Sequence, residues 1–427
     1  MNMKKLLQSK KRGSAILLAI VVVLILLAMG AGLLRLGLSS RTVSTRTASD
    51  IAARCAADAG LTKALFEMNE KLQVQPWDGS SLPQAIDVNL PNCDAAFSYE
   101  VKGNLASGFI IKSVGTADQA QRIVYAVLGL RGLFEHAIFT QENLILKPDT
   151  LVDGYNSHDP FDTDIKVNIG TQSTADASIV LNSGVVVEGN VVVGIGGDPD
   201  TVIKDLGATT GLQLSGTENA PLPQITPPAL PNMGDINNEG EVLTITPEDS
   251  GQYGNVILTK GTTVGVLEIS GGDVVLYITG KLDLGESCEI IVNDNSSLTV
   301  YIDGNIHCRS NISINNENPP EDPKKFQVYG TSAGEQFFDI KAKSDWSGTI
   351  YAPNADVVLY ANGDFYGSIV ANSFELKAGG NYYYDEALRE VELDDEGVRF
   401  VIKRWYEGGP NLTISDIKAI PIKEPVQ

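Results

Sequence analysis

Three histidines and one acidic loop are the parts of this sequence whose residue types could do chemistry. His136, His158 and His307 are the only histidines, and none stands in the HExxH or HxH spacing of a metal site. The loop at 152–164, VDGYNSHDPFDTD, is rich in carboxylates, which in pairs can hydrolyse a glycosidic bond or bind calcium. Asp, Gly, Asn and Pro are first of all turn formers, so we expect a solvated loop, with a catalytic or calcium site as the alternative. Its aspartates are Asp153, Asp159, Asp162 and Asp164.

A run of aromatic residues late in the chain is the second candidate. Tyr382, Tyr383 and Tyr384 precede Asp385, and aromatic rings beside a carboxylate can stack on a sugar. We expect instead that they close the exposed last coil of a repeat domain. His136 precedes a predicted strand, which favours a structural role. The sequence therefore predicts no catalytic residue, no metal ligand and no cofactor.

The four cysteines bound the redox chemistry. Cys55, Cys93, Cys288 and Cys308 are too few for a disulfide scaffold, and without any CxxC spacing a zinc site is not expected. Cys288 and Cys308 lie in neighbouring repeats, which makes them the better candidates for a disulfide in an exported chain.

Short strands that recur after residue 132 would position these residues. The run VLYITGKLDL at 275–284 matches TVYIDGNIHC at 299–308, and GTIYA at 348–352 matches GSIVA at 367–371. Such register-matched repeats are typical of a parallel β-helix, in which each coil stacks on the next. An immunoglobulin-like sandwich, which does not need matched repeats, is the alternative. The inward-facing positions are then Ile278, Leu282, Ile302, Ile306, Ile312, Ile314, Val358 and Leu376, with His307 pointing outward between two of them.

The fold class that follows is mainly β with a long N-terminal α-helix. Three alternating runs at 95–103, 108–117 and 121–132 predict a small antiparallel sheet of the kind that packs on such a helix. The expected segments are a basic leader at 1–13, a transmembrane and amphipathic helix at 14–72, the small sheet at 73–132, a right-handed parallel β-helix (solenoid) at 133–390 with a Pro-rich insertion at 218–232, and a C-terminal cap and tail at 391–427.

The stretch from Gly13 to Leu34 determines where the rest of the chain goes. It holds no charged residue and is long enough to cross a hydrocarbon core of about 30 Å as a helix, running from Ser14 through Leu18 to Leu34. The leader before it carries only basic charges, so the positive-inside rule keeps that end in the cytoplasm. A secretory signal peptide is the competing interpretation, but the apolar run is too long and no A-x-A site follows it.

The helix should continue beyond the membrane. Residues 35–72 contain no proline, and apolar residues recur at steps of three and four, so one face can pack on a folded domain. The expected packing residues are Ala52, Ala56, Ala59, Leu61, Ala64, Leu65 and Met68.

The charge of the exported part is strongly acidic. After residue 12 the chain holds 27 of its 32 Lys and Arg residues against all 53 Asp and Glu residues. This balance argues against nucleic acid as a partner and against adhesion to anionic lipid headgroups.

The N-terminal residues resemble those of type IV minor pilins of the PilX type. The match rests on Lys11, Arg12, Gly13 and Ser14 before the apolar run, and on the AADAG motif at 56–60. The resemblance implies that a prepilin peptidase cuts after Gly13 and leaves Ser14 as the new N-terminus; an uncleaved signal anchor is the alternative. Major pilins have Glu at the fifth mature position, where this chain has Leu18, so the resemblance implies an accessory subunit.

The second half also resembles a domain of uncharacterised function found behind such N-termini. The similarity rests on VDGYNS at 152–157, GTIYAPNAD at 348–356, GSIVA at 367–371 and YDEAL at 384–388. This resemblance implies a cell-surface or pilus-associated role and no reaction.

We therefore expect a non-enzymatic minor pilin or pseudopilin-like component of a type IV pilus or type II secretion system. Its expected partners are a prepilin peptidase, other pilin subunits through the N-terminal helix, the membrane and a surface polysaccharide. It should span the cytoplasmic membrane once, with its bulk periplasmic or extracellular. A membrane-anchored surface protein outside any pilus is the first alternative, and a β-helical enzyme acting on polysaccharide is the second.

Overall fold

A computed structural model describes residues 13–408, apart from 75, 106, 160, 163, 218–221, 315–321, 361–362 and 378, and apart from the side chains at 13–15 and 342–345. The basic leader before residue 13, the start of the Pro-rich insertion and the tail after 408 lie outside the described residues. The chain is mostly β with one long N-terminal helix. It divides into two compact units, Met1–Gly129 with Phe400–Gln427, and Leu130–Arg399.

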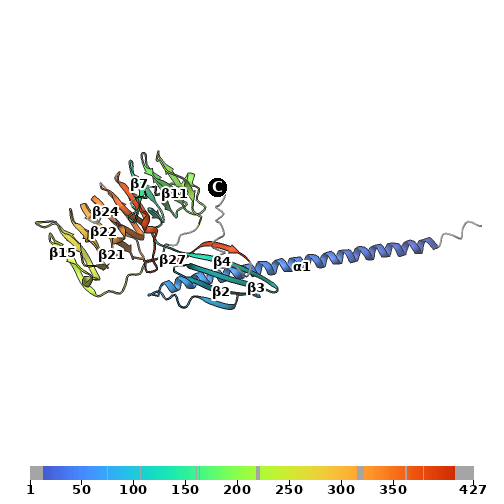
Figure 1. Ribbon diagram of the computed structural model, residues 1–427. Coiled ribbons are helices and arrows are strands. Elements are labelled where there is room, and N and C mark those ends of the chain that lie inside the picture. The colour runs from blue at the N-terminus through green and yellow to red at the C-terminus, as the bar shows by residue number, and fades with distance from the viewer. Residues whose placement is uncertain are drawn as a thin grey trace, which may run out of the picture. The chain divides into compact units, whose positions relative to one another are not determined.

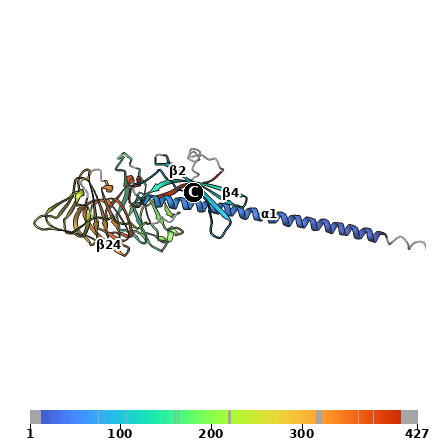
Figure 2. The same cartoon turned by 90° about the horizontal axis from the view of Figure 1, so that it is seen from below.

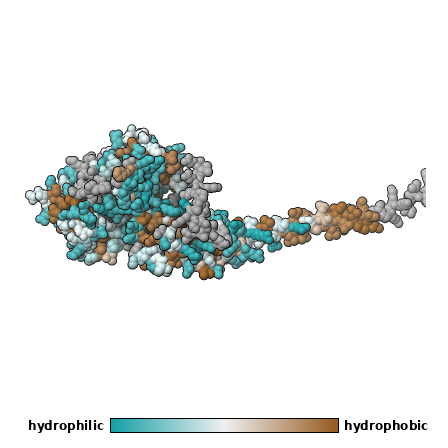
Figure 3. Space-filling view, viewed as in Figure 1, coloured by the Kyte–Doolittle hydropathy of each residue, from teal (hydrophilic) through white to brown (hydrophobic). Residues whose placement is uncertain are grey.

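A single helix, α1 (Gly13–Leu72), opens the first unit. Residues 16–48 are exposed along their whole length, and their apolar part forms the brown stretch of the helix in Figure 3. Leu18 and Leu34 are 70% and 67% exposed. In length and composition α1 can cross a membrane.

The C-terminal part of α1 packs on an antiparallel sheet, as the two views in Figures 1 and 2 show. The three predicted strands are confirmed as β2, β3 and β4, and β1 and β27 complete the sheet in the order β1-β2-β3-β4-β27. Four of the expected packing residues are buried, whereas Ala52, Ala59 and Leu65 are half-buried. The strands are β1 (Gln84–Asn89), β2 (Ala95–Asn104), β3 (Gly108–Ala117), β4 (Ala120–Arg131) and β27 (Arg399–Glu407). The buried residues of the helix face are Ala53, Ala56, Ala57, Leu61, Ala64, Met68 and Leu72.

The last strand returns to the helix through polar and aromatic contacts. The Asn69 side chain donates to the Phe400 carbonyl at 3.1 Å and accepts from the Phe400 N–H at 2.7 Å. The Phe400 ring packs on Phe109, with centroids 5.3 Å apart, and on Trp77 at 5.7 Å. Because Asn69 satisfies a backbone donor and a backbone acceptor together, it holds β27 in place beside α1.

The second unit consists almost entirely of short parallel strands. The acidic loop lies between β7 and β8. A 3₁₀ turn, η3 (Glu386–Arg389), follows β26, the last strand of this unit. The strands are β5 (Ile138–Thr140), β6 (Leu144–Leu146), β7 (Leu151–Tyr155), β8 (Val167–Thr171), β9 (Ile179–Leu181), β10 (Val186–Val187), β11 (Gly189–Val193), β12 (Ile203–Asp205), β13 (Gln213–Ser215), β14 (Asn232–Glu239), β15 (Val242–Ile245), β16 (Gly251–Thr259), β17 (Val266–Ile269), β18 (Asp273–Ile278), β19 (Leu282–Leu284), β20 (Glu289–Val292), β21 (Ser297–Ile302), β22 (Ile306–Ile314), β23 (Phe326–Gly330), β24 (Gln336–Leu359), β25 (Phe365–Leu376) and β26 (Asn381–Asp385). The short helices are α2 (Pro199–Val202), η1 (Pro247–Asp249) and η2 (Pro323–Lys325).

The repeats read from the sequence pair directly in this sheet. Strands β18 and β21 align Tyr277 with Tyr301, and β24 and β25 align Gly348 with Gly367. Both pairs are parallel and keep the offsets that the sequence matches predict. Matching residue types thus stand above one another on adjacent strands, which lets each apolar side chain pack on its equivalent.

The predicted right-handed parallel β-helix is wrong. The strands from β5 to β26 are connected in one 22-stranded sheet, which contains a closed parallel barrel of eight strands instead of a solenoid that winds from one end of the sequence to the other. The order of the strands does not follow the chain, because β25 pairs with both β5 and β6, and β26 pairs with β7. Figure 1 shows β24 from late in the chain lying between β22 and the earlier strand β7. The matched repeats predicted parallel pairing correctly and the path of the chain incorrectly.

The core of this unit is a continuous column of aliphatic and aromatic side chains. Seven of the eight predicted inward positions are at most 3% exposed. The exception is Val358, which is half-buried while its neighbours Val357 and Leu359 are each 1% exposed. The prediction there was off by one residue, since side chains alternate between the two faces of a strand.

Candidate functional site

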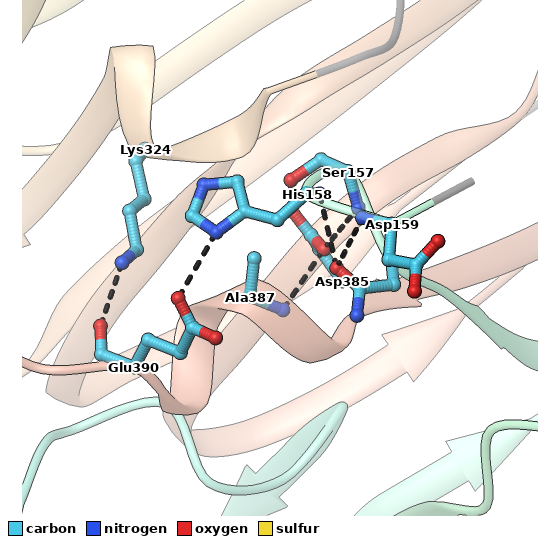
Figure 4. Close-up of polar contacts among 8 residues, drawn as sticks. Ser157, His158, Asp159, Lys324, Asp385, Ala387 and Glu390 are labelled. Atoms are coloured by element: carbon cyan, nitrogen blue, oxygen red, sulfur yellow. Dashed lines mark hydrogen bonds and ion pairs between the residues drawn. The ribbon is translucent and has the colours of Figure 1, made fainter. Parts of the chain in front are cut away.

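The acidic loop meets the C-terminal end of strand β26 at Asp385, and Figure 4 shows the residues involved. The Asp385 carboxylate accepts from the Ser157 hydroxyl at 2.6 Å and from the N–H groups of Ser157 and Ala387 at 3.0 Å each. Asp385 is fully buried, and burial raises the pKa of its carboxyl while the bonds from Ser157 oppose that rise. The carboxylate therefore ties the loop to η3 and caps that turn.

The histidine next to Ser157 turns away from it. The His158 ring contacts Glu390, with Nδ1 3.0 Å from Oε2, and Lys324 Nζ donates to the Glu390 carbonyl at 2.7 Å (Figure 4). A serine nucleophile needs a base that accepts its proton, whereas the Ser157 hydroxyl donates directly to Asp385. Ser157, His158 and Asp385 are the residue types of a catalytic triad, but their hydrogen bonds fix the position of the loop instead of activating the serine.

The remaining aspartates of the loop support its turns or lie in solvent. Asp159 accepts from the Phe161 N–H at 3.2 Å, and Asn156 accepts from the N–H groups of His158 and Asp159. Within the described part of the chain, no group of three or more His, Cys, Asp or Glu side chains is arranged to hold a metal ion. The loop that the sequence predicts is thus an ordinary network of Asx turns.

His307 faces outward, as its position in the repeat predicts. Its ring is 44% exposed, and Nδ1 lies 3.3 Å from the Asp339 carboxylate. Lys341 Nζ contacts the same carboxylate oxygen at 3.0 Å. Lys341 and Asp339 therefore form an ion pair near the surface, and His307 lies beside it. Ion pairs of this kind contribute little to stability.

His136 lies beside a cavity of about 230 Å³. Its ring stacks on Phe139 with centroids 4.8 Å apart, and its Nδ1 is buried without a hydrogen-bond partner among the described residues. Burial, together with the charges of Arg389 and Arg131, lowers the pKa of His136 from 6.5 to about 4. The ring is therefore neutral near pH 7, which agrees with a structural role.

We expect His136→Phe to remove an acid-sensitive part of the stability of this unit. The unfolded histidine takes up a proton near pH 6.5 and the folded one only near pH 4, so the folded state loses stability as the pH falls between these values. The loss is at most about 3 kcal/mol. Thermal unfolding of the full chain in detergent micelles at pH 7, 5.5 and 4 measures it, with His158→Phe as the exposed control. A variant that keeps the wild-type decrease in Tm would contradict this prediction.

The tyrosine run divides between the two faces of β26. Tyr382 and Tyr384 point inward and are fully buried, and their hydroxyls donate to the carbonyls of Ala137 at 2.8 Å and Phe134 at 2.7 Å. Tyr383 points outward and stacks on Tyr366 of β25, with ring centroids 5.1 Å apart. The outward stack was missed in the sequence, because Tyr366 lies on another strand without any local aromatic pattern.

The cysteines are free thiols in the structure. Cys55 and Cys93 are exposed, and Cys288 and Cys308 are buried. Burial raises the pKa of Cys308 and of Cys288, so both thiols are protonated and unreactive. The disulfide between Cys288 and Cys308 stays a prediction.

The apolar half of α1 is the remaining candidate surface. Helix α1 begins at Gly13, the predicted processing position, and the Ser14 side chain lies outside the described residues. Beyond the apolar run, the hydroxyls of Ser39, Thr42 and Thr45 donate to carbonyls three or four residues earlier at 2.9 Å. The helix therefore satisfies these polar groups internally and needs no contact with its own sheet there.

Comparison with known proteins finds one family model that matches part of the second unit. Residues 224–391 match a family model described as "Domain of unknown function (DUF7305)". The match runs from just before β14 through η3 and contains three of the four segments that carry the sequence resemblance to an uncharacterised domain. The search of curated proteins returns no match.

Among solved structures, the chain is similar to the crystal structure of the competence-associated pilin ComZ from Thermus thermophilus. The two sequences are 12% identical, and the likeness covers 84% of this chain and 97% of that chain with a TM-score of 0.24. A TM-score of this size does not establish a common fold. The PilX-type N-terminus stays a resemblance of sequence.

Proposed function

We propose that this protein is a pilin-type accessory subunit that holds its second unit at the cell surface. The observation that carries the proposal is the division of α1 into two parts. Residues 16–48 are exposed and largely apolar, and residues from Ala53 onward pack on the antiparallel sheet. A helix that is anchored in lipid or in a fibre at one end and in its own domain at the other end has this arrangement.

The chemistry of the described residues favours a binding or structural part over an enzyme. The one cluster with serine, histidine and aspartate bonds in a way that fixes a loop, and the histidine Nδ1 beside the small cavity is buried. Leu18 stands where the resemblance places the acid of a polymerising pilin subunit, and a leucine cannot form the charge pair that such an acid makes. We therefore infer a minor, non-enzymatic subunit whose partners are other pilin subunits, reached through α1.

Processing by a prepilin peptidase is the direct test. We expect the mature protein to begin at Ser14 and to lack residues 1–13 when it is expressed with a pilus assembly system. A Gly13→Val variant should keep the leader, because the bulky side chain blocks cleavage, and Gly37→Ala, which meets no atom within 4 Å, is the control. Intact-mass measurement after membrane extraction distinguishes the two forms. If wild-type protein keeps residues 1–13 under these conditions, the anchor is an uncleaved one outside any pilus.

A further inference from the structure

Three partly exposed tyrosines stand on adjacent strands at one surface of the second unit. Tyr366 of β25 and Tyr383 of β26 are stacked, and Tyr155 of β7 meets Tyr366 edge-on with centroids 5.6 Å apart. Strands β25, β26 and β7 are consecutive neighbours in the sheet, so the rings form one continuous patch. Burial raises the pKa of the Tyr383 hydroxyl, and the nearby carboxylates of Asp364 and Asp153 raise it further.

An open groove with a mixed polar and apolar lining begins where this patch ends. Asp153 stands beside Tyr383 in the strand register and also lines an open groove of about 770 Å³. Because the two residues share one face of paired strands, both side chains project to the same surface. The groove has acidic and other polar side chains beside apolar ones. Its other lining residues include Asp164, Lys166, Glu188, Asn190 and Thr210, together with Leu151, Ile165, Val187 and Leu212.

The groove is shaped by closely packed backbone. A Cβ at Gly189 would lie 1.8 Å from the Val167 carbonyl oxygen, and one at Gly211 would lie 2.5 Å from the Gly189 oxygen. Both positions therefore have to be glycine, and no side chain fills the floor there. The groove is thus built into the fold.

We propose that the tyrosine patch (Tyr155, Tyr366 and Tyr383) and the adjoining groove bind a neutral glycan chain. Aromatic faces pack on the C–H faces of sugar rings, and carboxylates accept hydrogen bonds from sugar hydroxyls. Three acids, Asp153, Asp164 and Glu188, stand in the groove against the single Lys166, so its charge repels acidic polysaccharides. That the second unit presents this glycan site at the cell surface rests on the function proposed above. Glycan binding by the purified protein does not depend on that function.

Binding of soluble polysaccharides to the full chain in detergent micelles tests this site. The probes are three neutral polymers, dextran, hydroxyethylcellulose and galactomannan, with polygalacturonate as the acidic polymer and polylysine as the basic one. We expect at least one neutral polymer to bind, and polygalacturonate not to bind. Tyr383→Ala should weaken binding about tenfold, which equals about 1.4 kcal/mol. Phe337→Ala, an aromatic side chain on β24 that is 47% exposed, should leave binding unchanged.

Two milder variants keep the test decisive if Tyr383→Ala does not fold. Tyr383→Phe keeps the ring and should retain most of the affinity, whereas Glu188→Gln, at an exposed position, should lower it. Binding of none of the neutral polymers would overturn the proposal, and so would equal binding of polygalacturonate. Binding of polylysine alone would assign the groove to a basic protein partner and would also overturn it. None of these outcomes depends on whether residues 1–13 are removed.

Discussion

Replacement of Gly115 by alanine is expected to destabilise the first unit by about 3 kcal/mol. Gly115 lies on β3 directly under α1, and a Cβ there would lie 2.0 Å from the Ala53 oxygen and 2.3 Å from the Ala57 nitrogen. Both are backbone atoms, so no rotamer change relieves the overlap, and the helix has to move away from the sheet. Ala53 and Ala57 are fully buried, and their small side chains let the α1 backbone approach β3 closely.

Gly129→Ala is the matched control for this prediction. The three atoms nearest to its new Cβ all belong to the side chain of Lys403, with Cγ at 2.7 Å, and that side chain is long and flexible. Hydrogen exchange of the peptides that cover 53–68 and 109–117, followed in the full chain in detergent micelles, measures the opening of the helix from the sheet. Equal protection in the two variants would show that α1 does not depend on the contact at Gly115.

Sequence patterns predicted the local structure well because that structure depends on neighbouring residues. The uncharged run after Gly13 predicts the exposed apolar helix, and alternating residues at 95–132 predict the three central strands of the small sheet. The matches between 275–284 and 299–308 predict parallel pairing, because each strand contacts the one that carries the same pattern. In each case the signal and the structure involve elements that follow one another closely in the chain.

The closure of the large sheet could not be predicted in this way. It depends on β25 pairing with β5, for example Ile369 with Ile138, and on β26 pairing with β7. Strand β5 has three residues, so it carries too few side chains to show a pattern that would match β25. A repeat comparison also aligns neighbours in the chain, and this join brings together segments from opposite ends of the unit.

The same separation hid the polar contacts at the candidate sites. Ser157 and Asp385 meet only because β7 and β26 are neighbours in the closed sheet, and nothing near either residue in the sequence signals the other. The prediction that Tyr382, Tyr383 and Tyr384 close an exposed last coil is wrong, because their strand β26 pairs with β25 on one side and with β7 on the other. Successive residues of a strand point to opposite faces, so two of the rings entered the core and one remained outside.

Tyr382→Ala is expected to be the most damaging single substitution in the second unit, with a loss of about 3–5 kcal/mol. The Tyr382 ring is fully buried at the join between β25 and β7, and it stacks on Phe365 with centroids 4.7 Å apart. Its removal leaves a cavity where the late strands meet the early ones. Because β26 pairs with β25 on one side and with β7 on the other, the strands on both sides lose support together.

Two neighbouring variants separate the contribution of the ring from that of its hydroxyl. Tyr382→Phe should cost only about 1 kcal/mol, because the Ala137 carbonyl that accepts from Tyr382 also accepts from the Ile369 N–H at 3.0 Å and keeps one partner. Tyr383→Ala changes the next residue on the outer face and should cost less than Tyr382→Ala, because no core cavity forms. Thermal unfolding of the full chain should therefore rank Tm as wild type, then Tyr382→Phe, with Tyr382→Ala lowest. A Tyr382→Ala variant with the Tm of Tyr382→Phe would mean that the neighbouring strands collapse into the space, and that closure at β26 does not depend on the ring.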